Sequence, residues 1–208
     1  MKILIADDHN IVRKGIKLIL AEAYPLAEIE DVPDSAELLK KATKKQWTVI
    51  ISDITMPGRP GIDVIKELKE LSHNTPILIL SAHSAEEYAV RSIKAGASGY
   101  LTKESAPDEL IKAVETILSG KRYLTSEITE LLIDSYGGDS EKAPHEVLSN
   151  REFEVLKLLA AGQSISNMSD ALSLSANTVS TYRARIMEKM HLHTNTELIK
   201  YAIFHKLV

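Results

Sequence analysis

Residues 49–58 read Val-Ile-Ile-Ser-Asp-Ile-Thr-Met-Pro-Gly, and this stretch decides the fold. An apolar run that ends in a turn signal is typical of a strand that is buried in a parallel sheet. Asp53 then lies at the carboxyl edge of that sheet, which is where open α/β sheets bind their ligands. The rest of the sequence is therefore interpreted in relation to Asp53.

The composition is that of a globular protein that can bury a core. The chain has 208 residues, of which 44% are hydrophobic and 26% charged, and it contains no cysteine. No apolar run approaches the roughly 20 residues that span a bilayer, and the N-terminus does not resemble a signal peptide. We therefore expect a cytoplasmic protein that has no membrane partner, no disulfides and no thiolate metal site.

Charge is distributed unevenly along the chain. Residues 1–120 contain 15 Lys and Arg against 18 Asp and Glu, whereas residues 145–208 contain 7 against 6. The first part is therefore not expected to bind nucleic acid, and the weak positive charge of the second part decides nothing by itself.

Strand and helix patterns alternate five times over residues 1–120. Short apolar runs predict strands, and apolar residues at helical spacing predict a helix after each strand. The strands are expected at 2–6, 27–32, 49–53, 76–81 and 99–103. Short loops and right-handed crossovers then imply an α/β fold with a doubly wound, five-stranded parallel sheet.

Polar side chains stand at the carboxyl ends of four of these strands: Asp7 and Asp8, Asp53, Ser81, and Lys103. In the flavodoxin-type strand order these ends come together. Clustered carboxylates repel one another, so a cation must lie beside them or one of them must be protonated. Mg²⁺ prefers oxygen ligands, and together with a lysine it neutralises the oxygens of a phosphoryl group in transfer. A single Asp at a strand end is more often a turn or cap residue, but the whole set favours a phosphoryl acceptor.

With these polar side chains at its strand ends, the stretch 1–120 resembles a response-regulator receiver domain. The matching motifs are Asp7-Asp8, Asp53 within Asp-Ile-Thr-Met-Pro-Gly, Ser81-Ala82, and Lys103. Lys103 is followed by Glu104 rather than by the proline of many receivers, which resembles the subgroup with a LuxR-type output domain.

The resemblance to a receiver implies a role for each residue of the motifs. A histidine kinase would phosphorylate Asp53, and Ser81 and Lys103 would bind the phosphoryl group while Tyr100 acts as the aromatic switch. The Mg²⁺ ligands would be Asp7, Asp8, Asp53 and the backbone carbonyl of Thr55. His9 and His83 are interpreted as loop residues near this crevice.

Residues 121–146 are predicted to form a linker between two domains. An amphipathic pattern from Tyr123 to Tyr136 predicts a helix, which we interpret as the start of a tether, with a packing element as the alternative. The polar, turn-rich stretch 137–144 is typical of a flexible linker.

Residues 147–208 are predicted to form a small all-α domain of four helices. Ser149 and Glu152 form a capping box before the first helix. The tight turn 173–175 joins a short helix at 165–172 to a longer one at 176–190, and Ser175 is a plausible cap of the longer helix. A helix pair joined by such a turn suggests a helix-turn-helix domain.

The outer face of the predicted helix 176–190 suits a DNA major groove. Small and polar side chains at its centre can approach base edges, and an arginine on each side can reach phosphates. The alternative is an ordinary surface helix with two solvated arginines. The candidate DNA-binding residues are Asn177, Ser180, Thr181, Arg183, Ala184 and Arg185.

Residues 147–208 resemble the LuxR-type helix-turn-helix domain. The matching stretches are Leu-Ser-Asn-Arg-Glu at 148–152, Leu-Ala-Ala-Gly at 159–162, and residues 175–190. The resemblance implies that the domain binds double-stranded DNA as a homodimer, with the last helix in the dimer contact. Ser180 stands where many members carry a DNA-contacting lysine.

Together these patterns predict a DNA-binding response regulator that is activated as a homodimer by a sensor histidine kinase. Two other classes remain open. A phosphatase of the haloacid dehalogenase kind would need a second Asp two residues after the nucleophile, where this chain has Thr55. A receiver whose helical domain docks only a protein partner would show no DNA affinity.

Overall fold

The computed structural model describes residues 1–56, 59–71, 74–136, 143–205 and 207–208. The predicted turn at residues 57–58 lies outside these ranges. The chain divides into two compact units, a first unit of Met1–Gly137 and a second unit of Gly138–Val208. No helix in the described ranges is both long and apolar enough to cross a membrane.

The first unit is built on a parallel sheet with the strand order β2-β1-β3-β4-β5. The predicted alternation of strands and helices is confirmed, with most boundaries within a residue or two of the expected ones. In chain order the elements are β1 (Lys2–Ala6), α1 (Asn10–Ala23), β2 (Glu28–Val32), α2 (Ser35–Ala42), β3 (Val49–Asp53), α3 (Gly61–Leu71), β4 (Ile77–Ser81), α4 (Ala85–Lys94), β5 (Gly99–Thr102) and α5 (Ala106–Leu118).

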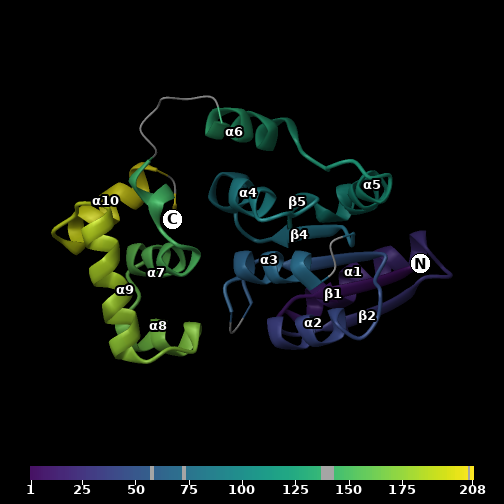
Figure 1. The fold of residues 1–208 in the computed structure, drawn as a ribbon, viewed down its shortest axis with the longest axis horizontal. Helices are drawn as coiled ribbons and strands as arrows, with labels where there is room; N and C mark the ends of the chain where they lie inside the picture. Colours follow the sequence, from purple (N-terminus) through teal and green to yellow (C-terminus); the bar gives the residue numbers. More distant parts are fainter. Residues whose placement is uncertain (57–58, 72–73, 137–142, 206) are drawn as a thin grey trace. The chain divides into compact units, whose positions relative to one another are not determined.

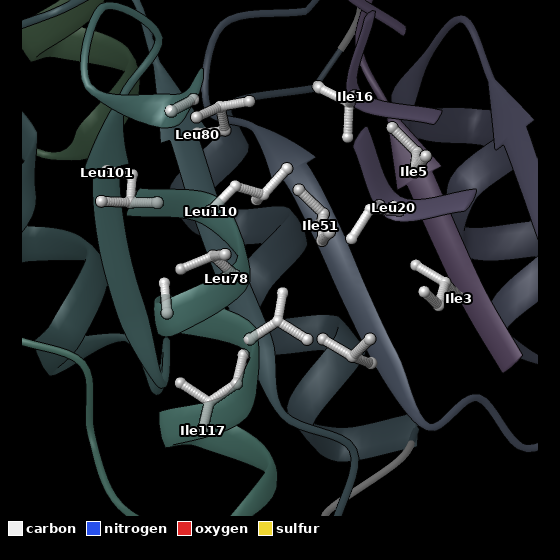
Figure 2. Close-up of a cluster of buried hydrophobic side chains, with 14 of the residues drawn as sticks. Ile3, Ile5, Ile16, Leu20, Ile51, Leu78, Leu80, Leu101, Leu110 and Ile117 are labelled. Atoms are coloured by element: carbon white, nitrogen blue, oxygen red, sulfur yellow. The ribbon is translucent and has the colours of Figure 1, made fainter. Parts of the chain in front are cut away.

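Helices α1 and α5 cover one face of the sheet and enclose a hydrophobic core (Figure 1). Figure 2 shows side chains from both helices meeting those of the central strands, and Leu20, Leu78 and Leu110 have no exposed surface. Burying one such leucine contributes about 1.5–3 kcal/mol. This packing fixes the strands in register, so that their carboxyl ends lie at one edge of the sheet.

The start of α3 is held close to the end of β3. A Cβ atom at Gly61 would lie 2.0 Å from the carbonyl oxygen of Ile54, so only glycine fits at this position. Ile54, the residue after Asp53, is therefore packed directly against the start of α3.

Helix α6 (Ser126–Tyr136) is a packed element of the first unit. It lies against α4, and its Ile128 and Leu132 are buried. The interpretation of this helix as the start of a tether is therefore wrong, because the same apolar stripe is used for packing. Most of the predicted flexible linker at 137–144 lies outside the described residues, and a short 3₁₀ helix that was not predicted, η1, follows at Pro144–Val147.

The second unit contains the expected helices, α7 (Asn150–Ala160), α8 (Ile165–Leu172), α9 (Ala176–Lys189) and α10 (Asn195–Phe204). The predicted capping box of Ser149 and Glu152 is confirmed. Glu152 is buried and also accepts a hydrogen bond of 2.7 Å from Lys189. Burial raises the pKa of Glu152, but Lys189 and Ser149 outweigh it and hold the pKa below its usual value. This carboxylate therefore ties the start of α7 to the end of α9.

The turn between α8 and α9 contains a residue in the left-handed conformation. Ser173 has a φ of 53°, and its neighbour Leu174 donates a backbone hydrogen bond of 2.9 Å to Ser169, as in a glycine-type helix end. Ser175, two residues after Ser173, caps α9 by accepting a hydrogen bond from the amide of Thr178, as expected. A left-handed non-glycine residue is strained, so glycine would fit this turn better.

We expect Ser173→Gly to stabilise the second unit by about 0.5–1 kcal/mol, because glycine adopts a positive φ without steric conflict. Calorimetric unfolding of the full chain would show this as a higher midpoint for that unit. The matched control is Ser180→Gly in the middle of α9, which should lower stability by roughly 0.5 kcal/mol. Destabilisation by Ser173→Gly would contradict the left-handed turn.

Candidate functional site

The carboxyl ends of the central strands bring the predicted polar residues together. Asp53 pairs with Leu80, and Ser81 pairs with Thr102, so β3, β4 and β5 end side by side. Asp7, Asp53 and Ser81 are each at most 4% exposed. These side chains therefore lie buried at one edge of the sheet, and Asp7 and Asp53 belong there to a cluster with Asp8 and His9 that we call the acidic pocket.

Lys103 lies between two carboxylates of the acidic pocket. Its Nζ donates a hydrogen bond of 2.7 Å to Asp53 Oδ2 and forms an ion pair of 2.7 Å with Asp7 Oδ2. Its backbone amide donates to the carbonyl of Ser81 at 2.7 Å, which fixes the start of the lysine side chain beside β4. The single ammonium group of Lys103 therefore contacts both carboxylates.

Burial and the shared ammonium shift the pKa values of Asp53 and Lys103. Burial raises the pKa of Asp53, and this effect outweighs the lowering by Lys103 and by the amide of Thr55, which donates to Asp53 Oδ1 at 3.0 Å. Burial lowers the pKa of Lys103, but Asp53 and Asp7 outweigh it and raise the pKa above its usual value. Burial thus decides the direction at Asp53, and the two facing carboxylates decide it at Lys103.

The residues present fit a divalent metal ion. One ligand atom from each of Asp7, Asp8, His9 and Asp53 lies within 4.8 Å of the others. The ammonium of Lys103 lies 2.7 Å from the buried Asp7 Oδ2 but is shared with Asp53, so one positive charge faces two carboxylates and leaves part of their negative charge for a metal ion. Carboxylate oxygens are the ligands that Mg²⁺ prefers.

His9 was interpreted only as a loop residue, but the structure places it in this cluster. Its Nδ1 lies 2.7 Å from Asp8 Oδ1 and 3.4 Å from Asp7 Oδ1. The side chain of His9 is 65% exposed, so the imidazole lies at the outer rim of the acidic pocket. Its place beside Asp7-Asp8 in the sequence is the signal that could have indicated this contact.

The predicted phosphoryl-binding and switch residues are connected through the loop after β4. The amide of His83 donates to Ser81 Oγ at 3.0 Å, and the hydroxyl of the fully buried Tyr100 donates to the carbonyls of His83 and Ser84 at 2.9 and 3.2 Å. His83 Nε2 also lies 3.0 Å from Thr55 Oγ1. Sequence reasoning did not predict that His83 links the loops after β3 and β4.

The candidate DNA-binding residues share the outer face of α9. Arg183 is half-buried and the other five are exposed, namely Asn177, Ser180, Thr181, Ala184 and Arg185. The opposite face carries Val179, Tyr182, Ile186 and Met190, which helical spacing predicts as an inner stripe. Tyr182 is half-buried and the other three are buried. Arg183 Nε donates to Asn195 Oδ1 at 3.0 Å, so this arginine is directed toward the start of α10.

The raised pKa of Asp53 predicts that Asp53→Asn stabilises the chain at pH 7 in the absence of Mg²⁺. The unfolded chain ionises this carboxyl more readily than the folded chain does, so folding at neutral pH carries a cost that the amide removes. The gain in stability should shrink as the pH falls through the raised pKa of Asp53 in the folded chain toward the ordinary value of about 4.

Urea unfolding of the first unit between pH 4 and pH 7.5 measures this gain. Asp134→Asn, on the exposed face of α6, is the matched control and should stay within about 0.5 kcal/mol of the wild type. A loss of stability in Asp53→Asn at pH 7 would show that the pairing with Lys103 outweighs burial.

Comparison with known proteins identifies both units. The receiver-domain family of response regulators matches residues 3–115, and the luxR family of bacterial regulatory proteins matches residues 146–202. The oxygen regulatory protein NreC of Staphylococcus epidermidis is 34% identical over 100% of this chain and 99% of its own length. The response regulator GacA of Pseudomonas syringae is 31% identical over 100% of this chain and 98% of its own.

A solved structure shows the same architecture. RcsB from Salmonella enterica serovar Typhimurium, bound to the promoter rprA in the presence of the phosphomimetic BeF₃⁻, is 29% identical to this chain. The similarity covers 97% of this chain and 98% of RcsB, with a TM-score of 0.67. The chain therefore belongs to the NarL/FixJ-type response regulators of two-component systems, which are DNA-binding transcription regulators and not enzymes.

Proposed function

We propose that this response regulator accepts a phosphoryl group on Asp53 from a sensor histidine kinase and then regulates transcription as a dimer on DNA. The observation that carries the proposal is the position of Lys103, whose Nζ lies 2.7 Å from both Asp53 and Asp7. A carboxylate at a strand end beside a fixed ammonium and a second acid is equipped to accept a phosphoryl group.

The bound metal ion would be Mg²⁺, which supplies positive charge to the oxygens of the phosphoryl group. Asp7, Asp8, Asp53 and the backbone carbonyl of Thr55 are the proposed ligands. The carboxylate of Asp53 is the proposed acceptor, and its Oδ1 is held by the amide of Thr55. Lys103 would neutralise the opposite side, and its ion pair with Asp7 keeps it in place before the reaction.

We further propose that Ser81 and Tyr100 carry the signal away from Asp53. The added phosphoryl group would draw the hydroxyl of Ser81 toward it, and Ser81 holds the amide of His83. Because Tyr100 donates to the carbonyl of His83, movement of this loop changes the hydrogen bonds of a buried ring beside α4. The proposed result is a receiver surface that favours the homodimer.

The proposed DNA-binding element is α9, in the helix-turn-helix domain that we propose for residues 147–208. The proposed receiver is 1–120, and residues 121–146 are proposed as the segment that connects the two, with α6 packed against α4. The central residues Asn177, Ser180, Thr181 and Ala184 would approach base edges, and Arg183 and Arg185 would contact phosphates. The promoter-bound structure of RcsB supports DNA as the partner. A dimer would span half-sites about one helical turn apart, and a DNA-bound regulator is expected in the cytoplasm.

Incubation with acetyl phosphate and Mg²⁺ should add one phosphoryl group to the wild-type chain and none to Asp53→Asn. Asp134→Asn, which changes an exposed carboxylate of α6 in the same way, should be labelled like the wild type. Intact-mass spectrometry measures the extent, and analytical ultracentrifugation of the same samples should show more dimer after labelling. Continued labelling of Asp53→Asn would remove Asp53 from its proposed role.

Arg185→Ala should weaken binding to all DNA sequences alike and reduce the slope of log K against log salt by about 1, because Arg185 is exposed and is a proposed phosphate contact. Fluorescence anisotropy over a range of salt concentrations measures both effects. Lys200→Ala on α10 removes the same charge from outside α9 and should leave the slope nearly unchanged. If the wild-type chain has no affinity for DNA at low salt, the second unit docks a protein partner instead.

A further inference from the structure

Two hydrogen bonds hold the main chain of Asp7, one from its amide and one to its carbonyl. Asp7 nevertheless lies after Ala6, the last residue of β1 that pairs with a neighbouring strand. Its amide donates to the carbonyl of Val32 at 3.2 Å, and its own carbonyl accepts a hydrogen bond of 2.5 Å from Arg13 Nη1. Asp7 is thus fixed by β2 directly and by a side chain of α1.

Arg13 reaches this carbonyl because a second contact anchors its guanidinium. Its Nε donates to Asp31 Oδ2 on β2 at 3.3 Å, and the arginine side chain is only 12% exposed. Asp31 is shared with Lys17, which lies 3.0 Å from Oδ1 and is 46% exposed. Two basic side chains of α1 therefore bind one carboxylate, but only Arg13 extends to Asp7.

The carbonyl of Asp7 and the amide of Asp8 belong to one planar peptide group. Holding the oxygen therefore fixes the orientation of this plane, and with it the backbone angles that direct the two carboxylates. Asp7 Oδ1 receives a further hydrogen bond of 2.7 Å from the amide of His9, which is the residue before α1. The guanidinium thus acts on the direction of both acids without touching either carboxylate.

We propose that Arg13, anchored by Asp31, is a positioning residue that orients the Asp7-Asp8 peptide group for binding of a divalent cation. The inference rests on the proposed Mg²⁺ site and adds a residue to it that does not contact the ion. It also makes β2, which contributes no ligand, part of the support of the acidic pocket.

The charge of Arg13 and its hydrogen bond to the carbonyl of Asp7 have opposite effects on the affinity for a divalent cation. A guanidinium near an acidic pocket repels a divalent cation, so removing its charge alone would strengthen binding of the cation. Removing its hydrogen bond to the carbonyl of Asp7 would weaken binding, because the ligands lose their fixed direction. The sign of the change in affinity therefore distinguishes a positioning residue from a nearby charge.

The experiment compares Arg13→Met with Lys17→Met in the full chain. Both changes remove one positive charge and one contact to Asp31 from the same helix, but only the first removes the contact to Asp7. Titration calorimetry with Mg²⁺ alone should show an affinity about tenfold lower or weaker still for Arg13→Met, as expected for a lost outer-shell partner. Lys17→Met should bind Mg²⁺ as tightly as the wild type or more tightly.

A kinetic measurement separates positioning from a general loss of structure. With acetyl phosphate, Arg13→Met should need more Mg²⁺ for half-maximal labelling but reach the wild-type rate at saturating Mg²⁺. Arg13→Lys keeps the charge but cannot contact Asp31 and the carbonyl of Asp7 together, so it should behave like Arg13→Met. If Arg13→Met does not fold, Arg13→Lys alone decides the point: it keeps the positive charge, so a lower affinity for Mg²⁺ in this variant reports only the lost contact to the carbonyl of Asp7.

The outcomes are distinguishable. Equal or higher affinity for Mg²⁺ in both Arg13→Met and Arg13→Lys, beside a wild type that binds Mg²⁺ and is phosphorylated, would overturn the positioning role alone. A wild-type chain that neither binds Mg²⁺ nor accepts a phosphoryl group would overturn the proposed function itself.

Discussion

The structure of the acidic pocket depends on one ammonium group shared by two carboxylates. Lys103 approaches both Asp7 and Asp53 at 2.7 Å, while burial keeps water from solvating the acids. The negative charge is therefore only partly compensated, because one ammonium faces two carboxylates. In the proposed function, this remaining negative charge would attract a divalent cation, and the cation would in turn allow a phosphoryl group to approach.

The parallel sheet makes this arrangement possible. Asp7, Asp53 and Lys103 are far apart in the chain, yet each follows or ends a strand, and the strands end at one edge. The hydrophobic contacts of α1 and α5 with the sheet hold the strands in register and so hold the charges at fixed distances (Figure 2). Helix α1 also carries Arg13, so the element that covers the core orients a backbone group of the pocket as well.

Much of the fold and of the acidic pocket could be predicted from sequence, because the signals were local. An apolar run ending at Asp53 is visible in ten residues, and parallel topology then brings distant strand ends together. The contacts of Arg13 and of His83 were not predictable in this way, because a long side chain or an imidazole can point in several directions from the same backbone. For α6, the apolar stripe indicated a buried face but not its partner, which is α4. The left-handed Ser173 carried no glycine signal.

Anomalous diffraction from crystals of the wild-type chain soaked in Mn²⁺ tests the proposed metal site most directly, since the position of the ion is observed rather than inferred. We expect a peak in the acidic pocket within coordination distance of the carboxylates of Asp8 and Asp53, with Lys103 still beside Asp53. No peak in that pocket at saturating Mn²⁺, or a peak held by other carboxylates alone, would contradict it.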